Sequence, residues 1–248
     1  MTHDTLPMPR GFIFDYGGTI DTNGCHWGKM IWHAYERLKV PVDEKCFREA
    51  YVYAERTLGR TPIIQSTYNF HATLKAKLRI QMDYLLQNAL QGSVGETEAE
   101  KMTDDLLDDL YTRVRQTVAD NRWALECLAE KVPLALVSNF YGNIGVVLKE
   151  MEIDGLFKAV VESAVVGVRK PDPRIFLMGA EALGLQAGEL VAVGDNYSKD
   201  IVPASNSGFR TVWLRGEQWD EQEYDTSLPE CVVDTIGALP ALFGLAPK

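Results

Sequence analysis

The chain has 248 residues, of which 46% are hydrophobic and 24% are charged, as is usual for a globular protein. This length fits one large domain or a domain with an insertion, and it can bury a full core. The formal net charge of −10 argues against a general nucleic-acid surface, which needs clustered cations, but it leaves room for a locally positive pocket.

The first element is expected at Gly11-Phe12-Ile13-Phe14, a short apolar run typical of a buried strand. The run ends in Asp15, and Gly17 and Gly18 then allow a sharp turn before Thr19. In open α/β sheets, ligands bind at the carboxyl ends of the strands. We therefore treat Asp15 as a candidate functional residue, the alternative being an aspartate that only caps a turn.

Residues 23–111 are expected to form a helical insertion. Apolar side chains recur there at helical spacing, for example at Leu74 and Leu78. The stretches 40–43 and 92–96 have the composition of helix breaks followed by new helix starts. No alternating strand pattern interrupts this block.

From residue 123 onward, apolar runs alternate with helical patterns. The runs expected to be strands cover residues 133–139, 159–163, 190–195, 211–214 and 231–233. The helices expected beside them cover residues 123–128, 144–151, 173–183 and 201–207. Alternation of this kind predicts a parallel sheet with helices on both faces.

Polar residues stand at the ends of three predicted strands. Asp15 and Asp195 each end an apolar run, and Ser138-Asn139 ends a third. Lys170 lies just before a helix that begins with proline. Neighbouring parallel strands would bring these groups to one edge of the sheet. Two carboxylates, a hydroxyl with an amide, and a lysine suit a Mg²⁺ and phosphate site.

These four stretches resemble the four motifs of the haloacid dehalogenase-like hydrolase superfamily. The resemblance covers residues 10–22 and 112–245, and the insertion is similar to the helical cap that this superfamily places after its first motif. Four motifs in the right order, ending with Gly-Asp-Asn-Tyr-Ser-Lys-Asp at 194–200, are far more specific than one Asp-x-x-Gly-Thr alone.

The resemblance assigns the reacting groups. It implies that Asp15 is the nucleophile that takes the phosphoryl group, and also a Mg²⁺ ligand. The backbone carbonyl of Gly17 and the carboxylate of Asp195 would be the other ligands. Lys170 would neutralise charge on the nucleophile and the phosphoryl group. Physical chemistry agrees, because a carboxylate attacks a dianion only when cations suppress their repulsion.

The resemblance also implies supporting roles. Ser138 would donate a hydrogen bond to the transferring phosphoryl group, and the other substrate-binding residues implied in the motifs are Gly18, Thr19 and Asn139. Asn196 and Asp200 would support the site, with Asp200 acting through water or by orienting Lys170. The alternative for Asp195 and Asp200 is that they cap helix N-termini.

Gly17 departs from the superfamily pattern. Most of its phosphatases carry a second acid at this position, which protonates the leaving oxygen and later activates water. General acid–base catalysis is commonly worth about 10²–10⁴-fold in rate. Tyr16, Asp21 and His26 are close in sequence, but Asp21 is interpreted as shaping the flap and His26 as a surface or core residue.

Four hypotheses follow from Gly17. The chain is a phosphatase or phosphotransferase that obtains its proton elsewhere or uses good leaving groups, or it is a catalytically silent Mg²⁺- and phosphate-binding regulator. It could instead be a phosphonatase, which uses a cap lysine; the candidates are Lys29, Lys39, Lys45, Lys75 and Lys77. The fourth hypothesis is a haloacid dehalogenase, although that group carries tyrosine at the position of Gly17 and lacks the acid that corresponds to Asp195.

The cap is expected to supply substrate specificity. The cap residues considered for the pocket are Trp27, Trp32, Arg56, Arg60, Tyr68 and His71. Arg56 and Arg60 lie four residues apart on one helical face and could meet an anionic substrate. Core packing for the aromatic residues and a solvated face for the arginines are the alternatives.

Location and partners are predicted from what the sequence lacks. The N-terminal residues show no signal-peptide pattern, and no apolar run has the length of a membrane span. The four cysteines have no metal-ligand or redox spacing, so we expect reduced thiols in a cytoplasmic protein, with a disulfide as the alternative. No pattern indicates an oligomeric state.

The predicted fold is therefore α/β: a three-layer, Rossmann-like parallel-sheet core at residues 1–22 and 112–248, with a helical cap at 23–111. The predicted function is a Mg²⁺-dependent hydrolase of small phosphorylated molecules, without nucleic-acid or membrane partners.

Overall fold

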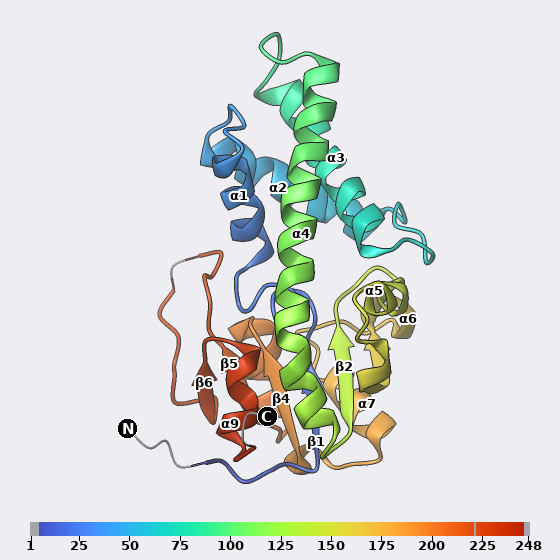
Figure 1. Ribbon diagram of the computed structural model, residues 1–248, viewed down its shortest axis with the longest axis vertical. Coiled ribbons are helices and arrows are strands. Elements are labelled where there is room, and N and C mark those ends of the chain that lie inside the picture. The colour runs from blue at the N-terminus through green and yellow to red at the C-terminus, as the bar shows by residue number, and fades with distance from the viewer. Residues whose placement is uncertain (1–4, 221, 246–248) are drawn as a thin grey trace.

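The computed structural model describes residues 5–220 and 222–245. An α/β core forms the lower part of Figure 1, and four helices extend above it as a cap. The first strand enters the cap through the flap after Asp15, and the chain returns to the core through one long helix. Four helices therefore lie above the part of the chain that contains the sheet.

The core contains one parallel sheet of six strands in the order β3-β2-β1-β4-β5-β6. The strands are β1 (Gly11–Phe14), β2 (Leu134–Ser138), β3 (Phe157–Glu162), β4 (Leu190–Gly194), β5 (Arg210–Leu214) and β6 (Cys231–Val233). β1, β2 and β4 are buried along their whole length, which explains their unbroken apolar sequences. The predicted α/β fold class is confirmed.

Helices cover both faces of this sheet. The short helices are α5 (Ile144–Glu150), α6 (Ser163–Val166), α7 (Arg174–Leu183), α8 (Val202–Asn206) and α9 (Leu239–Leu242). Alternate residues of β1 point to opposite layers: Phe12 and Phe14 belong to one hydrophobic cluster, and Ile13 belongs to another with Ile175 and Phe176 of α7. The core thus has three layers, as predicted.

The cap consists of α1 (Trp27–Arg37), α2 (Glu44–Arg60), α3 (Phe70–Asn88) and the upper part of α4 (Glu96–Ala129). Side chains fix the helix starts. Asp43 accepts a hydrogen bond from the Cys46 amide at the start of α2, and Asn69 caps α3 by accepting one from Ala72. The predicted breaks at 40–43 and 92–96 are confirmed, whereas the sequence analysis did not predict the break between α2 and α3.

The helix α4 differs from the prediction. It runs unbroken for 34 residues from the top of the cap to the core, so the helix expected at 123–128 is only its last part. The sequence explains this, because residues 96–129 contain neither glycine nor proline. The division proposed at residue 111 falls inside this helix.

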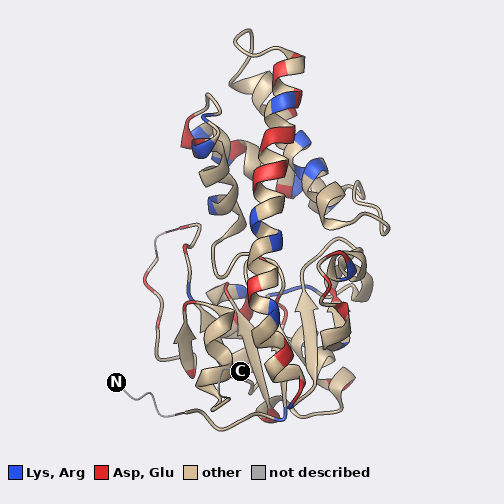
Figure 2. Ribbon diagram, viewed as in Figure 1, with Lys and Arg blue, Asp and Glu red and all other residues tan. Residues whose placement is uncertain are grey.

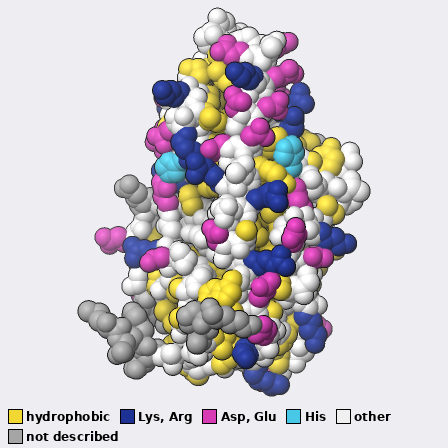
Figure 3. Space-filling view, viewed as in Figure 1, with side chains coloured by type: hydrophobic (Ala, Val, Ile, Leu, Met, Phe, Trp, Pro, Cys, Tyr) yellow, Lys and Arg dark blue, Asp and Glu magenta, His cyan; other side chains and the backbone are white. Residues whose placement is uncertain are grey.

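Charged side chains of both signs lie along α4 (Figure 2). In its acidic stretch, Leu106, Leu107 and Leu110 are buried while Asp104 and Asp105 face solvent, as expected of a solvated helix. Charged side chains of both signs are also scattered over the face drawn in Figure 3, between hydrophobic and other side chains. Within the described residues, no helix is long and apolar enough to span a bilayer, and the four cysteines are unpaired.

Candidate functional site

The strand order brings the two predicted aspartates together. β1 and β4 are neighbours, so Asp15 and Asp195 follow adjacent strand ends. One carboxylate oxygen from each of Asp15, Asp195 and Asp200 lies within 4.8 Å of the others, and all three residues are buried. This cluster lies at the carboxyl edge of the sheet, where ligands bind in open α/β folds.

Lys170 joins the cluster as its cation. Its Nζ atom lies 2.6 Å from Asp15 Oδ1 and 2.6 Å from Asp200 Oδ1, and the side chain is 3% exposed. Asn139 holds the Lys170 backbone in place: its Oδ1 accepts from the Lys170 amide at 2.9 Å, and its Nδ2 donates to the Lys170 carbonyl at 3.0 Å. The Asn139 side chain therefore positions the lysine.

The cluster has an excess of negative charge. Three carboxylates and one ammonium leave two negative charges without a cationic partner. Burial raises the pKa of Asp195 well above its ordinary value and that of Asp200 to about 6. Burial works against the charge of Lys170, but Asp15 and Asp200 outweigh it and raise the lysine pKa. A divalent cation with oxygen ligands, such as Mg²⁺, fits this donor set and its charge.

Thr19 and Gly18 hold Asp195 in place. The Thr19 hydroxyl accepts from the Asp195 amide at 3.0 Å and lies 3.0 Å from Asp195 Oδ1. Thr19 is fully buried and does not line the cavity, so the contacts it makes in the structure are with the protein. Gly18 has a φ of +97°, and a Cβ there would lie 2.5 Å from both Asp195 carboxylate oxygens. Only glycine fits this position.

There is open space beside Gly17, where most phosphatases of the superfamily pattern described above would have an acid. The nearest atom to a Cβ built there is Trp27 Nε1, at 3.8 Å. That indole nitrogen donates to Asp21 Oδ2 at 2.9 Å, and Asp21 Oδ1 accepts from the Gly18 amide at 2.7 Å. Asp21 thus braces the flap, as expected. Burial raises its pKa to about 7, although both hydrogen bonds favour the charged form.

The remaining motif residues complete the floor of the cavity. Ser138 is buried at the end of β2 and lines the cavity together with Asn196. Asn196 caps the turn η3 (Tyr197–Ile201) by accepting from the Lys199 amide, and its own amide donates to Asp200 Oδ2 at 3.0 Å. Asn196 is therefore the helix cap, and the Asp200 carboxylate is left to hold Lys170.

The roof of the cavity comes from the cap. The cavity has a volume of about 190 Å³ and lies between the aspartate cluster and one face of α2 and α3. Its cap-side lining includes His26, Trp27, Tyr51, Glu55, Phe70, Thr73, Leu74 and Lys77. Among these, the predictions selected Trp27 as a pocket residue and considered Lys77 as a cap lysine. The spacing of Phe70, Leu74 and Lys77, at one helical face, is the sequence signal that could have found the others.

Arg56 is not brought to the cavity. Glu55 lines the cavity, and Arg56, its neighbour in the sequence, points about 100° away around α2. Arg56 is exposed and lines a separate shallow groove with Tyr53 and Tyr84. Arg56 therefore does not line this cavity, and its exposure agrees with the solvated-face alternative.

The other proposed cap residues also lie elsewhere. Trp32 packs on Phe47, with ring centroids 5.2 Å apart, and His71 packs edge-on against Tyr111 at 5.0 Å. Neither these residues nor Arg60 and Tyr68 line the cavity in the described structure. The core-packing alternative describes the two aromatic pairs.

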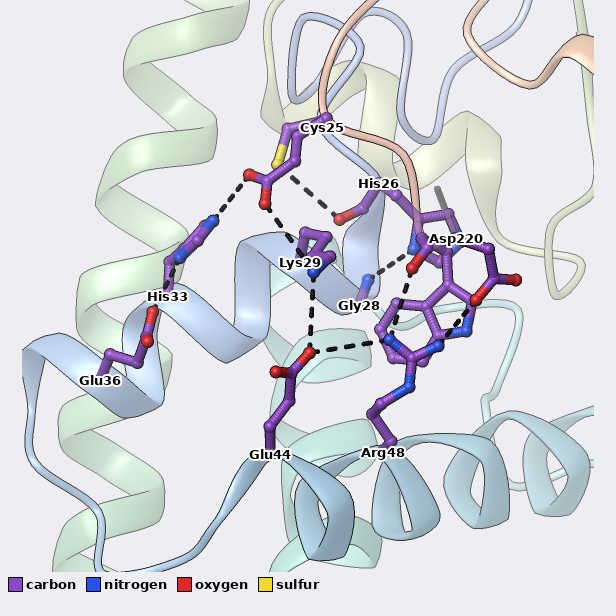
Figure 4. Close-up of polar contacts among 11 residues, drawn as sticks. Cys25, His26, Gly28, Lys29, His33, Glu36, Glu44, Arg48 and Asp220 are labelled. Carbon is purple, nitrogen blue, oxygen red and sulfur yellow. Dashed lines mark hydrogen bonds and ion pairs between the residues drawn. The ribbon is translucent and has the colours of Figure 1, made fainter. Parts of the chain in front are cut away.

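A strap from the core, which we define as residues 215–220 after β5, lies against the cap (Figure 4). The Glu217 carbonyl accepts from the His26 amide at 2.8 Å, and its carboxylate lies 2.7 Å from His33 Nε2. Asp220 pairs with Arg48 of α2 at 2.8 Å. The sequence analysis gave no indication of this strap.

Trp219 is the centre of the strap. The Arg48 guanidinium lies 3.9 Å from its ring centroid, and the Tyr51 and His26 rings lie 4.9 and 5.2 Å away. Gly28 provides the space for it, since a Cβ there would lie 2.0 Å from the indole ring. Trp219 therefore supports two side chains that line the cavity.

Comparisons with known proteins agree with this geometry. A family model described as haloacid dehalogenase-like hydrolase matches residues 9–208. A phosphoglycolate phosphatase of Shigella dysenteriae is 25% identical over 244 residues, which is 95% of this chain and 93% of that protein. A glyceraldehyde 3-phosphate phosphatase of Methanopyrus kandleri is 37% identical over 89 residues, which is 35% of this chain and 38% of that protein's length.

A solved structure shares the fold. The crystal structure of a dehalogenase superposes with a TM-score of 0.63 at 17% identity, covering 98% of this chain and 100% of that chain. The family match spans most of the chain and includes the ends of β1 and β4, which carry the aspartate cluster. The chain belongs to the haloacid dehalogenase-like hydrolase family.

Proposed function

We propose that the chain is a Mg²⁺-dependent phosphatase that hydrolyses small phosphorylated molecules through a phosphoryl group carried by Asp15. The setting of Asp15 carries the proposal: it is buried at the end of β1, with the Lys170 ammonium 2.6 Å from one oxygen and Asp195 beside it. Such a carboxylate has the cationic support that attack on a dianion requires. The two relatives above are both named as phosphatases of small phosphate esters.

The reaction proceeds in two steps. An oxygen of Asp15 bonds to phosphorus, the bond from phosphorus to the ester oxygen breaks, and the leaving alcohol takes a proton from water. A second water then bonds to phosphorus and gives a proton to the hydroxide that the first water left, the bond to Asp15 breaks, and phosphate leaves. The covalent step divides one difficult displacement into two easier ones. Lys170 stays protonated because Asp15 and Asp200 raise its pKa.

The metal would be held by Asp15, Asp195 and the Gly17 carbonyl. When bound, Mg²⁺ supplies positive charge that polarises the phosphoryl oxygens. Thr19 fixes the orientation of the Asp195 carboxylate in advance, and Asp200 holds the lysine. The chain therefore supplies a preorganised set of oxygen donors.

The phosphoryl oxygens would be bound at the end of β2. Ser138 lines the cavity and has a hydroxyl to donate. The Asn139 side chain is occupied with Lys170, so its backbone amide is the group left for the substrate. Gly18 contributes close backbone approach, because its own amide is donated to Asp21.

Because no acid stands at position 17, substrates whose leaving group needs little protonation are favoured. An acyl or aryl phosphate expels a stable anion and needs little protonation, whereas an alkyl phosphate expels a strong base. The cavity holds no carboxyl group at this position. We expect acyl phosphates to react fastest, then aryl phosphates, then alkyl phosphates.

The phosphonatase alternative requires an uncharged cap lysine. Lys77 is the cap lysine that lines the cavity, and its Nζ lies 2.5 Å from Glu55 Oε1. Burial would lower its pKa, but Glu55 outweighs burial and the pKa is raised. A lysine held as ammonium is a poor nucleophile toward a carbonyl. The dehalogenase alternative leaves the Asp195 carboxylate without a use.

A second candidate function is a silent Mg²⁺- and phosphate-binding regulator, and Gly17 is the observation that favours it. One experiment separates the two. Phosphate release from acetyl phosphate and p-nitrophenyl phosphate is measured with and without Mg²⁺ for the wild type, Asp15→Asn, and Asp105→Asn as a control on the exposed face of α4.

If the chain is a phosphatase, we expect Mg²⁺-dependent release of phosphate. Asp15→Asn should lower the rate of release by about 10³-fold or more, and Asp105→Asn should leave it unchanged. A regulator predicts no release, together with a rise in melting temperature when Mg²⁺ and beryllium fluoride are added, which Asp15→Asn abolishes. Release that Asp15→Asn does not affect would exclude both functions for this site.

A further inference from the structure

Three cations line the cavity in addition to Lys170. They are Lys77 on α3, Arg169 before α7, and Lys199 in the turn η3. The phosphoryl chemistry proposed above uses none of them. Their convergence is notable in a chain with a net charge of −10, because a local positive field inside an acidic protein attracts anions to one place.

Lys77 is a partly buried ammonium in the roof. It lies 5.6 Å from the Trp27 ring centroid and 5.5 Å from that of Tyr51, and Glu55 is the carboxylate that pairs with it. An ammonium has three donors, and its ion pair with one oxygen of Glu55 leaves donors for a ligand. The roof thus offers hydrogen-bond donors on a group that stays charged.

Arg169 and Lys199 supply charge at the rim. Both are exposed, and neither has a carboxylate within 4.0 Å among the described residues. Glu55 balances Lys77, and both oxygens of Asp21 already accept hydrogen bonds from Gly18 and Trp27. Apart from the aspartate cluster, no carboxylate in the cavity is therefore left to balance the charge of Arg169 and Lys199.

The size of the cavity limits what these cations can bind. A volume of about 190 Å³ is below the range of about 300–1,000 Å³ for drug-sized ligands. The walls between roof and floor are largely aromatic, from Trp27, Tyr51, Phe70, Phe140 and Tyr141. The enclosed space suits a short carbon skeleton better than a nucleotide.

We infer that the substrate is a small phosphate monoester with a second anionic group, such as a carboxylate, on a short carbon skeleton. The phosphoryl group lies at Asp15, and Lys77, Arg169 and Lys199 receive the second anion. This inference rests on the proposed function, because the phosphoryl site fixes which end of the molecule meets the cations.

Competition measures this preference without requiring turnover of the probe. Acetyl phosphate hydrolysis is inhibited with 3-phosphoglycerate or with glycerol 3-phosphate, which share a three-carbon skeleton and differ by a carboxylate in place of a hydroxymethyl group. We expect the carboxylate to lower the inhibition constant by about tenfold, because contacts with charged donors are strong.

The variants Arg169→Gln, Lys199→Gln and Lys77→Gln test the assignment. Each rim variant is expected to reduce the ratio of the two inhibition constants by about threefold, as for exposed ion pairs, and Lys77→Gln by more. Lys158→Gln removes an exposed lysine of β3 that does not line the cavity and controls for net charge.

The outcomes are distinguishable. If acetyl phosphate is not hydrolysed, the proposed function fails. If it is hydrolysed but both inhibitors bind equally, or if Lys158→Gln reduces the ratio as much as the rim variants do, the second-anion site is refuted while the phosphatase stands. A ratio that falls only with the three cavity variants supports the inference, and melting temperatures verify that each variant is folded.

Discussion

Replacing Gly17 with aspartate tests the account of the missing acid. The backbone accepts a side chain there, because Gly17 has no positive φ and a Cβ would lie 3.8 Å from its nearest neighbour, Trp27 Nε1. The new carboxyl group would lie near Asp15 and Asp21. Their negative charges raise its pKa, which favours the protonated form that a general acid needs.

The expected gain follows from the leaving group. General acid catalysis is worth about 10²–10⁴-fold, or about 2.7–5.4 kcal/mol of barrier. Trp27 already donates to Asp21, and a carboxylate at 17 would compete for that donor, so we expect the lower end, about 10²-fold. The gain should appear with glycerol 3-phosphate and be small with acetyl phosphate, whose carboxylate leaving group needs no proton.

The assay is initial phosphate release from the two substrates, with Gly17→Asn and Gly17→Ala as controls for shape without an acidic proton. The reasoning is refuted if folded Gly17→Asp gains no more than Gly17→Asn on the alkyl phosphate. An equal gain on both substrates would also refute it, because protonation of the leaving group would then not be the cause.

Three further predictions concern the aspartate cluster and the strap. Burial raises the pKa of Asp195 and Asp200, so the folded protein binds protons that the unfolded chain releases. The free energy of unfolding of the Mg²⁺-free protein should therefore increase as the pH falls from 7.5 to 5.5. Calorimetry should show that Mg²⁺ raises the melting temperature more at pH 7.5 than at pH 5.5. Gly18→Ala places a methyl group against the Asp195 carboxylate, so it should abolish both turnover and the Mg²⁺-induced rise, unlike Gly59→Ala, where space is open. Gly28→Ala should displace Trp219 and raise KM more than it lowers kcat. Its tryptophan fluorescence should lose the same contribution that Trp219→Ala removes.

Each of these has a contrary result. A Mg²⁺-induced rise that is equal at both pH values would mean that protons and metal do not share the carboxylates. Full activity in Gly18→Ala would show that the flap relaxes away from Asp195. Unchanged KM in both strap variants would mean that the cavity wall does not depend on the strap.

The sequence predicted the sheet and the floor of the site well, for a physical reason. Fully buried parallel strands must be apolar along their whole length, and Asp15 and Asp195 interrupt such runs where the strands end. Strand adjacency then places these residues together without detailed knowledge of side chains. The buried Lys170 followed from its motif.

The roof was harder to predict, because it depends on how helices rotate against one another. Tyr51 and Glu55 line the cavity while Arg56 faces away, a difference of one residue that helical spacing leaves open until the packing face is known. The strap depends on an indole ring fitting above Gly28, a contact between positions nearly two hundred residues apart. No local pattern encodes such a contact.

The continuous helix α4 gives the two parts of the molecule unequal connections. One connection is 34 residues of unbroken hydrogen-bonded backbone, about 51 Å long, which resists bending. The other is the short turn at residues 20–26, which contains Asp21 and directly follows Gly17 and Gly18. If the cap rocks, we therefore expect the bend at this turn and not along α4, which would make the hinge and the loop that follows the nucleophile the same piece of chain.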